Sequence, residues 1–256
     1  MIVSSSNPDV KDMHGLHLFH GDISNCSMRV RMALNEKGLP WVSHHIDLRK
    51  KENISDYYFA IHPKGLVPCL VDDGVVHIES NEIIDYLDRK FPEPRLRPAD
   101  GEQERLMLEL LQLAADLHLP AVKPFIYARK VAPLLAKSAE EQAKYDEIQT
   151  DSGLKDFHNK HAEGKQFGED EVEKAIERLN AAFGRLEDML ADGRPWLLGA
   201  SFTLADIAWS PLYFTLNGAG FDFTPFPNVI GWMKRLEARD SYRTGITDWC
   251  EDFAKI

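Results

Sequence analysis

Four small or polar residues, Ser24-Asn25-Cys26-Ser27, separate an apolar run from a helix-like run of the sequence. Residues 16–19 predict a strand and residues 27–37 predict a helix. Backbone N–H groups at a helix start have no partner within the helix and carry partial positive charge, so this turn can hold an anion. A thiolate suits such a site. It belongs either to a bound ligand or to Cys26, whose pKa the helix end should lower.

Composition limits the ligands that this turn can serve. The chain has 256 residues, 44% of them hydrophobic, which is enough for one large domain or two ordinary ones. The net charge is −11, and Lys and Arg are scattered along the chain. This pattern argues against a nucleic-acid partner or an anionic membrane surface. An anionic ligand must therefore be held by local geometry.

Targeting and metal signals are missing from the sequence. Residues 1–14 are polar and predict a flexible arm, and no run approaches the roughly 18 apolar residues of a membrane span. We expect a cytoplasmic protein. The three cysteines, Cys26, Cys69 and Cys250, have neither metal-ligand spacing nor the even count of a disulfide framework. We expect no metal.

The chain divides near residue 95, where prolines interrupt it and strand-like alternation ends. The expected order before that point is strand–helix–strand, then strand–strand–helix, which is the thioredoxin arrangement. The second half contains the Asp73-Gly74 turn signal, and Pro68 opens the third strand, where Val67-Pro68 is a candidate cis bond. The expected segments are strands 16–19, 41–48, 67–71 and 75–78 and helices 27–37 and 81–90.

The remainder of the sequence predicts helices. Leu106, Leu110, Leu113 and Leu117 recur at helical spacing, and a similar pattern follows from residue 172. The predicted organisation is an α/β plus all-α chain, in which an N-terminal thioredoxin-like domain precedes a C-terminal helical bundle. Its parts are an arm (1–14), a thioredoxin-like domain (15–95), a linker (96–104) and an all-helical domain (105–256). The charged segment 138–170 predicts an exposed helix and loop with a solvated face rather than a site.

Four landmarks together resemble the soluble glutathione transferases. The stretch from Ser24 to Arg31 is similar to the active-site turn of the zeta class, the maleylacetoacetate isomerases, and of the tetrachlorohydroquinone reductive dehalogenases. Val67-Pro68, Glu79-Ser80 and the helix cap from Thr203 to Asp206 follow in the family's order. The likeness covers roughly residues 15–250. Two positions depart from it: the dehalogenases have Asn-Ser at 79–80, and the zeta turn has an aromatic residue at 28.

The resemblance implies a glutathione site. Val67 would pair its backbone with the cysteinyl part of glutathione, with Pro68 fixing the geometry. Ser80, at the N-cap of the helix that follows, would bind the γ-glutamyl carboxylate, or only cap the helix. Glu79 would face the ligand's ammonium group. Lys64 would hold the glycyl carboxylate, or lie solvated in its loop.

The same likeness suggests roles for the first turn. Free glutathione has a thiol pKa near 8.5, so only a small fraction is thiolate at neutral pH. A hydroxyl donor from Ser24 would lower that pKa and raise the population of the nucleophile. Asn25 would give a second hydrogen bond to the sulfur or would shape the turn. Cys26 would resolve a mixed disulfide, as in the dehalogenases, or would be a small buried filler.

The second substrate is expected between the domains, beside the first helices of the bundle. The candidate lining residues are His118, Phe125, Tyr127 and Trp209, each of which could instead serve packing. Arg29 and Arg31 could contact a substrate carboxylate, but they are more simply surface residues of their helix. The implied reactions are reductive dehalogenation, aryl β-ether cleavage as in lignin degradation, or cis–trans isomerisation of maleylacetoacetate. The resemblance also implies a homodimer. A non-catalytic glutathione-binding module stays open.

Overall fold

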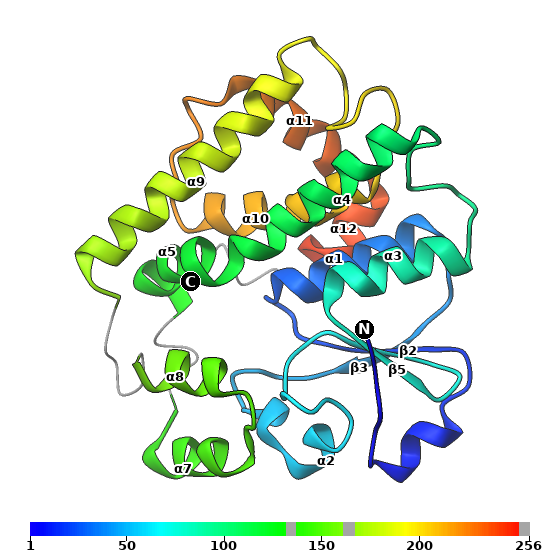
Figure 1. Ribbon diagram of the computed structural model, residues 1–256, viewed down its shortest axis with the longest axis vertical. Coiled ribbons are helices and arrows are strands. Elements are labelled where there is room, and N and C mark those ends of the chain that lie inside the picture. Colours follow the sequence, from blue (N-terminus) through cyan, green and yellow to red (C-terminus); the bar gives the residue numbers. More distant parts are fainter. Residues whose placement is uncertain (132–136, 161–166, 251–256) are drawn as a thin grey trace.

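The computed structural model describes residues 1–131, 137–160 and 167–250, in which a small sheet lies beside a larger group of helices (Figure 1). Residues 161–166 of the charged segment and 251–256 of the expected helical domain lie outside the described residues. None of the helices in the described part is long and apolar enough to cross a membrane.

The sheet has five strands in the order β1-β5-β4-β2-β3. β2 and β3 are parallel, with His20 opposite His45, and the other pairs are antiparallel. The predicted strand–helix–strand then strand–strand–helix order is therefore confirmed. The strands are β1 (Ile2–Val3), β2 (Leu16–His20), β3 (Val42–His45), β4 (Cys69–Asp72) and β5 (Val75–Ile78).

Local signals place the turns of this sheet. Asp73 and Gly74 both have positive φ, 47° and 82°, and connect β4 to β5, as the hairpin signal predicts. The Val67-Pro68 bond is cis, as predicted, and β4 begins directly after it at Cys69. The proline thus lies at the strand entrance, where the ladder needs no N–H from it.

The expectation of a flexible arm at residues 1–14 is wrong. Ile2 and Val3 form β1 and pair antiparallel with His77 and Val76 of β5. A short 3-10 helix, η1 (Pro8–Asp12), follows and buries Val10 against the sheet. A two-residue strand has too little length to show apolar alternation, so its position depends on the open edge of β5.

Helices pack on the sheet and on one another. The described part of the chain also contains the 3-10 helices η2 (Glu52–Ile54) and η5 (Thr247–Trp249) and the π-helices η3 (His118–Val122) and η4 (Tyr127–Val131). The α-helices are α1 (Asn25–Glu36), α2 (Asp56–Phe59), α3 (Ser80–Lys90), α4 (Gly101–Asp116), α5 (Lys123–Ile126), α7 (Ala139–Ile148), α8 (Ser152–Lys160), α9 (Glu169–Leu190), α10 (Leu204–Gly218), α11 (Pro227–Glu237) and α12 (Asp240–Gly245). α4 begins inside the predicted linker 96–104.

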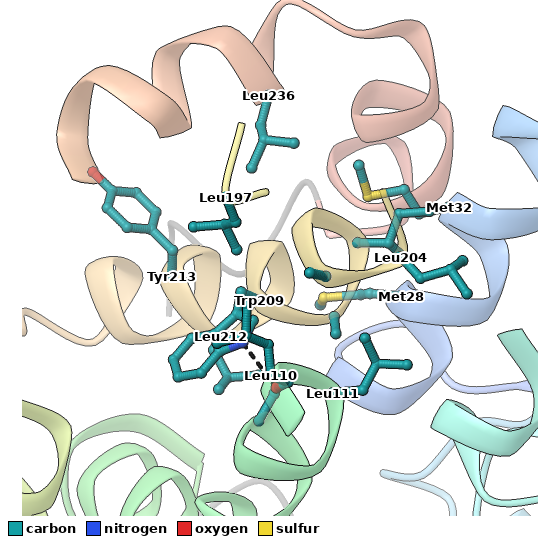
Figure 2. Close-up of a cluster of buried hydrophobic side chains, with 14 of the residues drawn as sticks. Met28, Met32, Leu110, Leu111, Leu197, Leu204, Trp209, Leu212, Tyr213 and Leu236 are labelled. Atoms are coloured by element: carbon teal, nitrogen blue, oxygen red, sulfur yellow. Dashed lines mark hydrogen bonds between the residues drawn. The ribbon is translucent and has the colours of Figure 1, made fainter. Parts of the chain in front are cut away.

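α1 is the element that joins the two parts of the molecule. It contacts α3 beside it and α10 and α12 of the helical part, and Figure 1 shows it between the sheet and those helices. Its residues from Ser27 to Leu34 are all buried. Met28 and Met32 enter the same apolar cluster as Leu111 of α4 and Leu204 of α10 (Figure 2). One core therefore positions the start of α1 relative to both parts.

Candidate functional site

The turn from Ser24 to Ser27 is the N-terminus of α1. Ser24 is the N-cap residue, and the helix begins at Asn25, two residues earlier than the sequence predicts. The Ser24 Oγ accepts a hydrogen bond from the Ser27 N–H at 3.2 Å. This bond orients the side chain and uses an oxygen lone pair, so the O–H group stays able to donate to an anion.

The first helical residues have hydrogen-bonding groups to spare. The N–H groups of Asn25 and Cys26 have no acceptor within the described residues. Asn25 is buried, and its Oδ1 has no partner among the described residues. Ser24 and Cys26 are partly exposed. The turn therefore combines an oriented hydroxyl, unused N–H groups and a reachable thiol, which suits an anionic sulfur.

Val67 lies against Gly21, which precedes this turn and donates to Ser27 Oγ at 3.2 Å. A Cβ placed on Gly21, at the end of β2, would come 3.0 Å from Leu48 Cδ1 and 3.4 Å from Val67 Cγ2, so glycine permits the close approach. Val67 is partly exposed, and its backbone forms no hydrogen bond with the described part of the chain. An extended ligand can pair with this backbone as one more strand rung.

The start of α3 differs from the predicted cap. The N-cap residue is Glu79, and Ser80 is the first helical residue. Glu79 has a φ of 67°, a conformation that costs a non-glycine residue of order 1–3 kcal/mol and is frequent at functional sites. Glu79 is exposed, Ser80 is buried, and the N–H groups of Ser80 and Asn81 have no acceptor in the described chain. These groups can bind a carboxylate.

Arg29 connects α1 to α3 and to the helical part, and the prediction that it lies on the surface is wrong. Its side chain is fully buried and donates to Ser80 Oγ at 3.3 Å, Ala114 O at 3.3 Å and Ala208 O at 2.9 Å. Burial lowers the pKa of this guanidinium, and the nearby Cys26 opposes that effect. Arg29 therefore connects the start of α1 to the start of α3 and to carbonyl groups of α4 and α10.

The prediction that Arg31 lies on the surface is also wrong, because its side chain is buried and bonded to carbonyl groups. Arg31 is buried, and its guanidinium donates to the carbonyl oxygens of Gly21, Asp22 and Gly245 at 2.6, 3.0 and 2.8 Å. Burial lowers its pKa to about 10. Gly21 and Asp22 come shortly before Ser24, so their bonds to Arg31 fix the position of the chain that leads into the turn.

Sequence reasoning missed Lys123, the first residue of α5. Burial lowers the pKa of its ammonium group to about 8, against the opposing electrostatic effect of Cys26. The neighbouring His118 has its pKa lowered to about 3, mainly by burial and also by the charges of Lys123 and Arg29. A lysine in the otherwise apolar stretch 119–128 is a signal that could have identified it.

Two of the four candidate second-substrate residues lie in the core, in agreement with the packing alternative. Trp209 is fully buried, and its indole N–H donates to Leu110 O at 3.0 Å (Figure 2). Phe125 is also buried and meets Phe221 edge to face. Tyr127 and His118 are partly exposed. Burial, with Tyr145 nearby, raises the pKa of Tyr127 to about 12.

Lys64, predicted to hold a carboxylate, has one beside it. Its Nζ lies 3.2 Å from Asp151 Oδ2, in the segment that was expected to be a solvated surface. Both side chains are about one-third exposed. No group of three or more His, Cys, Asp or Glu side chains that could hold a metal ion occurs within residues 1–131, 137–160 and 167–250.

Comparisons with known proteins agree with this arrangement. The model of the glutathione S-transferase N-terminal domain matches residues 18–95, and that of the C-terminal domain matches residues 169–235. Protein LigF of a Sphingobium species is 26% identical over 85% of this chain and 87% of its own. The tetrachloro-p-hydroquinone reductive dehalogenase of Sphingobium chlorophenolicum is 26% identical over 91% and 96%.

Solved structures extend the likeness to the fold. The crystal structure of the β-etherase LigF superposes with a TM-score of 0.81 at 24% identity, over 90% of this chain and 98% of that one. A zeta-class glutathione S-transferase of Euphorbia esula is 37% identical over a shorter part, 43% of this chain and 50% of its own. The two domain matches lie in the family's order, on the elements that build the site, and the chain belongs to the glutathione S-transferase superfamily.

Proposed function

We propose that the protein binds glutathione in its N-terminal domain and activates the thiol at Ser24 for attack on an electrophilic, aromatic small molecule. One observation supports this proposal: the start of α1 is connected to both of the other segments that we expect to bind glutathione. Gly21 contacts Val67 and donates to Ser27 Oγ, and Arg29 of α1 donates to Ser80. Family membership supports glutathione-dependent activity independently of these contacts.

Each part of glutathione has a matching feature in this arrangement. The Val67 backbone, free of protein partners in the described chain, suits the cysteinyl unit. The N-terminus of α3 at Ser80 suits the γ-glutamyl carboxylate, and the exposed Glu79 suits the ammonium group. Lys64 suits the glycyl carboxylate. The sulfur would then lie at the α1 turn, where the Ser24 O–H donates to the thiolate.

The proposed reaction begins with attack of the glutathione thiolate on carbon and departure of a phenolate or halide. The sequence likeness to LigF and to the dehalogenase supports this step, and the charge of Lys123, which interacts with Cys26, suits an anionic leaving group. The partial zeta-class match supports cis–trans isomerisation as a second candidate. A non-catalytic module would bind glutathione and turn over none of these substrates.

Reductive dehalogenation would need a second thiol, and Cys26 is partly exposed in the right turn. Its thiolate would attack the glutathionyl sulfur of the aryl thioether. A sulfur–sulfur bond forms, the carbon–sulfur bond breaks, and the electron pair passes to the ring carbon, which takes a proton. A second glutathione then reduces the Cys26–glutathione disulfide.

Thiolate titration of the complex tests the activating role of Ser24. The ultraviolet absorbance of bound glutathione thiolate is followed against pH for wild type and Ser24→Ala, with Ser4→Ala as a control far from the turn. We expect a higher thiol pKa in Ser24→Ala only. An unchanged titration curve in that variant contradicts the proposal.

Turnover with a small panel of substrates identifies the reaction. Halogenated hydroquinones, aryl β-ethers and maleylacetone are each tested with glutathione. Conversion of a halogenated hydroquinone or an aryl ether supports thiolate attack, conversion of maleylacetone alone supports isomerisation, and glutathione binding without any turnover supports a binding module.

Family members are typically dimers, and we propose a cytoplasmic homodimer here as well. Light scattering combined with size-exclusion chromatography measures the mass in solution. A mass of one chain at micromolar concentration contradicts the dimer.

A further inference from the structure

The segment with α7 and α8 is docked onto the loop that carries Lys64. Gln149, between these helices, is 1% exposed, and its Nε2 donates to the Lys64 carbonyl oxygen at 2.9 Å. Its Oε1 accepts from the Asp151 N–H at 3.0 Å. The buried Gln149 amide bonds to both segments and fixes their positions relative to each other. Asp151 is therefore held opposite Lys64.

Asp151 uses its two carboxylate oxygens for different purposes. Oδ1 accepts the Leu154 N–H at 3.0 Å and caps the start of α8, while Oδ2 forms the ion pair with Lys64 Nζ at 3.2 Å. The Leu154 N–H and the Lys64 ammonium lower the pKa of this carboxyl group, so it is ionised at neutral pH. The lysine that suits a ligand carboxylate is thus already paired with one from the protein.

A second contact holds the same segment in place. Lys144 of α7 lies 3.4 Å from Asp56 at the start of α2, and Tyr145 is buried beside Gln149. Figure 1 shows α7 and α8 next to α2, below the main group of helices. Because Gln149 and Lys144 contact the Lys64 loop and α2 without using the Asp151 carboxylate, the Lys64–Asp151 pair can open without undocking the segment.

We propose that the α7–α8 segment forms a wall of the glutathione site at its glycyl end, and that Asp151 is a specificity-determining residue that competes with the glycyl carboxylate for Lys64. This inference rests on the proposed function. Glutathione gains an ion pair with Lys64 only by displacing Asp151, so one carboxylate replaces another. An exposed pair is weak, and the competition should therefore alter the dissociation constant of glutathione by a small factor.

The consequence is a weakened preference for ligands that carry the glycyl carboxylate. In the wild type, glutathione and its glycyl ethyl ester should differ little in affinity, because the ester leaves the Lys64–Asp151 pair intact. When Asp151 loses its charge, Lys64 becomes available to glutathione but offers nothing new to the ester. Discrimination between the two ligands then rises.

Isothermal titration calorimetry of wild type, Asp151→Asn and the control Glu147→Gln tests this. Asparagine keeps the cap of α8, and Glu147 is an exposed residue of α7 that loses the same charge. We expect the dissociation constant for glutathione to fall about three- to fivefold in Asp151→Asn, the size of an exposed ion pair, with no change for the ester or in Glu147→Gln.

A second background shows whether Asp151 acts through Lys64. In Lys64→Met, the further change Asp151→Asn should leave both dissociation constants unchanged. Equal affinities for glutathione in wild type and Asp151→Asn overturn the inference, as does a gain that persists without Lys64. Failure of the wild type to bind either ligand overturns the proposed function itself, so the two failures are distinguishable.

Discussion

Helices α1 and α10 both begin after an N-cap residue with a hydroxyl group, Ser24 and Thr203, but the two helix starts have different functions. At α10, Asp206 accepts hydrogen bonds from Leu197 N–H, Thr203 N–H, Thr203 Oγ1 and Trp232 Nε1, at 3.0, 2.9, 3.1 and 2.8 Å. All of these groups are buried within one part of the protein. We call this helix start closed, because both carboxylate oxygens of Asp206 accept hydrogen bonds from the protein. Its function is to stabilise the fold.

At α1, the start of the helix is open. Ser24 caps one N–H, no acidic residue follows in the first turn, and the N–H groups of Asn25 and Cys26 lack acceptors in the described chain. The turn is partly exposed, with Arg29 buried behind it. A buried carboxylate that accepts four hydrogen bonds at α10 stabilises the protein, whereas the partly exposed donors at the start of α1 can bind an anion.

The largest effect is expected from breaking the closed start. Asp206→Ala or Asp206→Asn should lower the free energy of unfolding by about 3–5 kcal/mol, because buried donors lose their acceptor. Asparagine should not rescue, since its NH₂ would face another donor. Urea unfolding measures the change, with the exposed Glu237→Gln as a control. Near-native stability of Asp206→Asn contradicts the assigned hydrogen bonds.

The open start should respond in activity rather than in stability. Ser24→Ala should reduce kcat/KM with glutathione by roughly 10²-fold, the loss typical of one donor to a developing or bound anion. Its free energy of unfolding should fall by only about 1 kcal/mol, the cost of one cap. Steady-state kinetics and urea unfolding of the same sample separate the two. A stability loss as large as that of Asp206→Ala removes the distinction between the helix starts.

Replacing Lys123 should raise the free energy of unfolding, whereas replacing Asp206 or Ser24 should lower it. The native pKa of Lys123, about 8, lies below its unfolded value near 10.4. Below pH 8 the lysine is charged in both states, and its charge lowers the free energy of unfolding. Between about pH 8 and 10.4 the unfolded chain binds more protons, so this contribution to stability rises with pH. Lys123→Met should therefore add about 1–2 kcal/mol at pH 7, and less at pH 10.

Kinetics complete the test of Lys123. Activity of Lys123→Met should fall although its stability rises, the usual trade-off at a functional site. Urea unfolding at pH 7 and pH 10, together with kcat/KM, provides the measurements. A variant that is less stable at pH 7 and fully active shows that Lys123 is a packing residue.

The smallest effect on stability is expected for Cys26. Cys26→Ser should change the free energy of unfolding by less than about 0.5 kcal/mol, because the side chain is partly exposed. Intact-mass measurement after turnover of a halogenated hydroquinone should show a glutathione adduct on the wild type only. Full activity of Cys26→Ser on that substrate rules out the resolving role.

Local signals predicted much of the N-terminal part. The strand order, the Asp73-Gly74 turn, the cis bond before Pro68 and the Ser24 turn all depend on neighbouring residues, so the sequence shows them directly. β1 was missed because its order comes from pairing with β5, more than seventy residues away. Ser80 moved from the cap into the helix because Glu79 adopts a positive φ that its residue type does not predict.

Distant contacts account for the remaining errors in the site. Arg29 and Arg31 have the spacing of ordinary helix residues, and they are buried because carbonyls such as Ala208 O and Gly245 O meet them there. Trp209 was a candidate either for substrate contact or for packing, and only the structure shows that it packs against Leu110 in the core. The charged segment with Gln149 appeared solvated, because nothing local shows that its amide pairs with Lys64.

The amino-acid sequence by itself determined the fold class, the family likeness and the position of the α1 turn, since these follow from local spacing and short motifs. Only the tertiary structure decided which charges are buried behind that turn and which carboxylate faces Lys64. The physical reason is that burial and ion pairing depend on groups brought together from both parts of the chain, and their effect on charge depends on the surrounding dielectric.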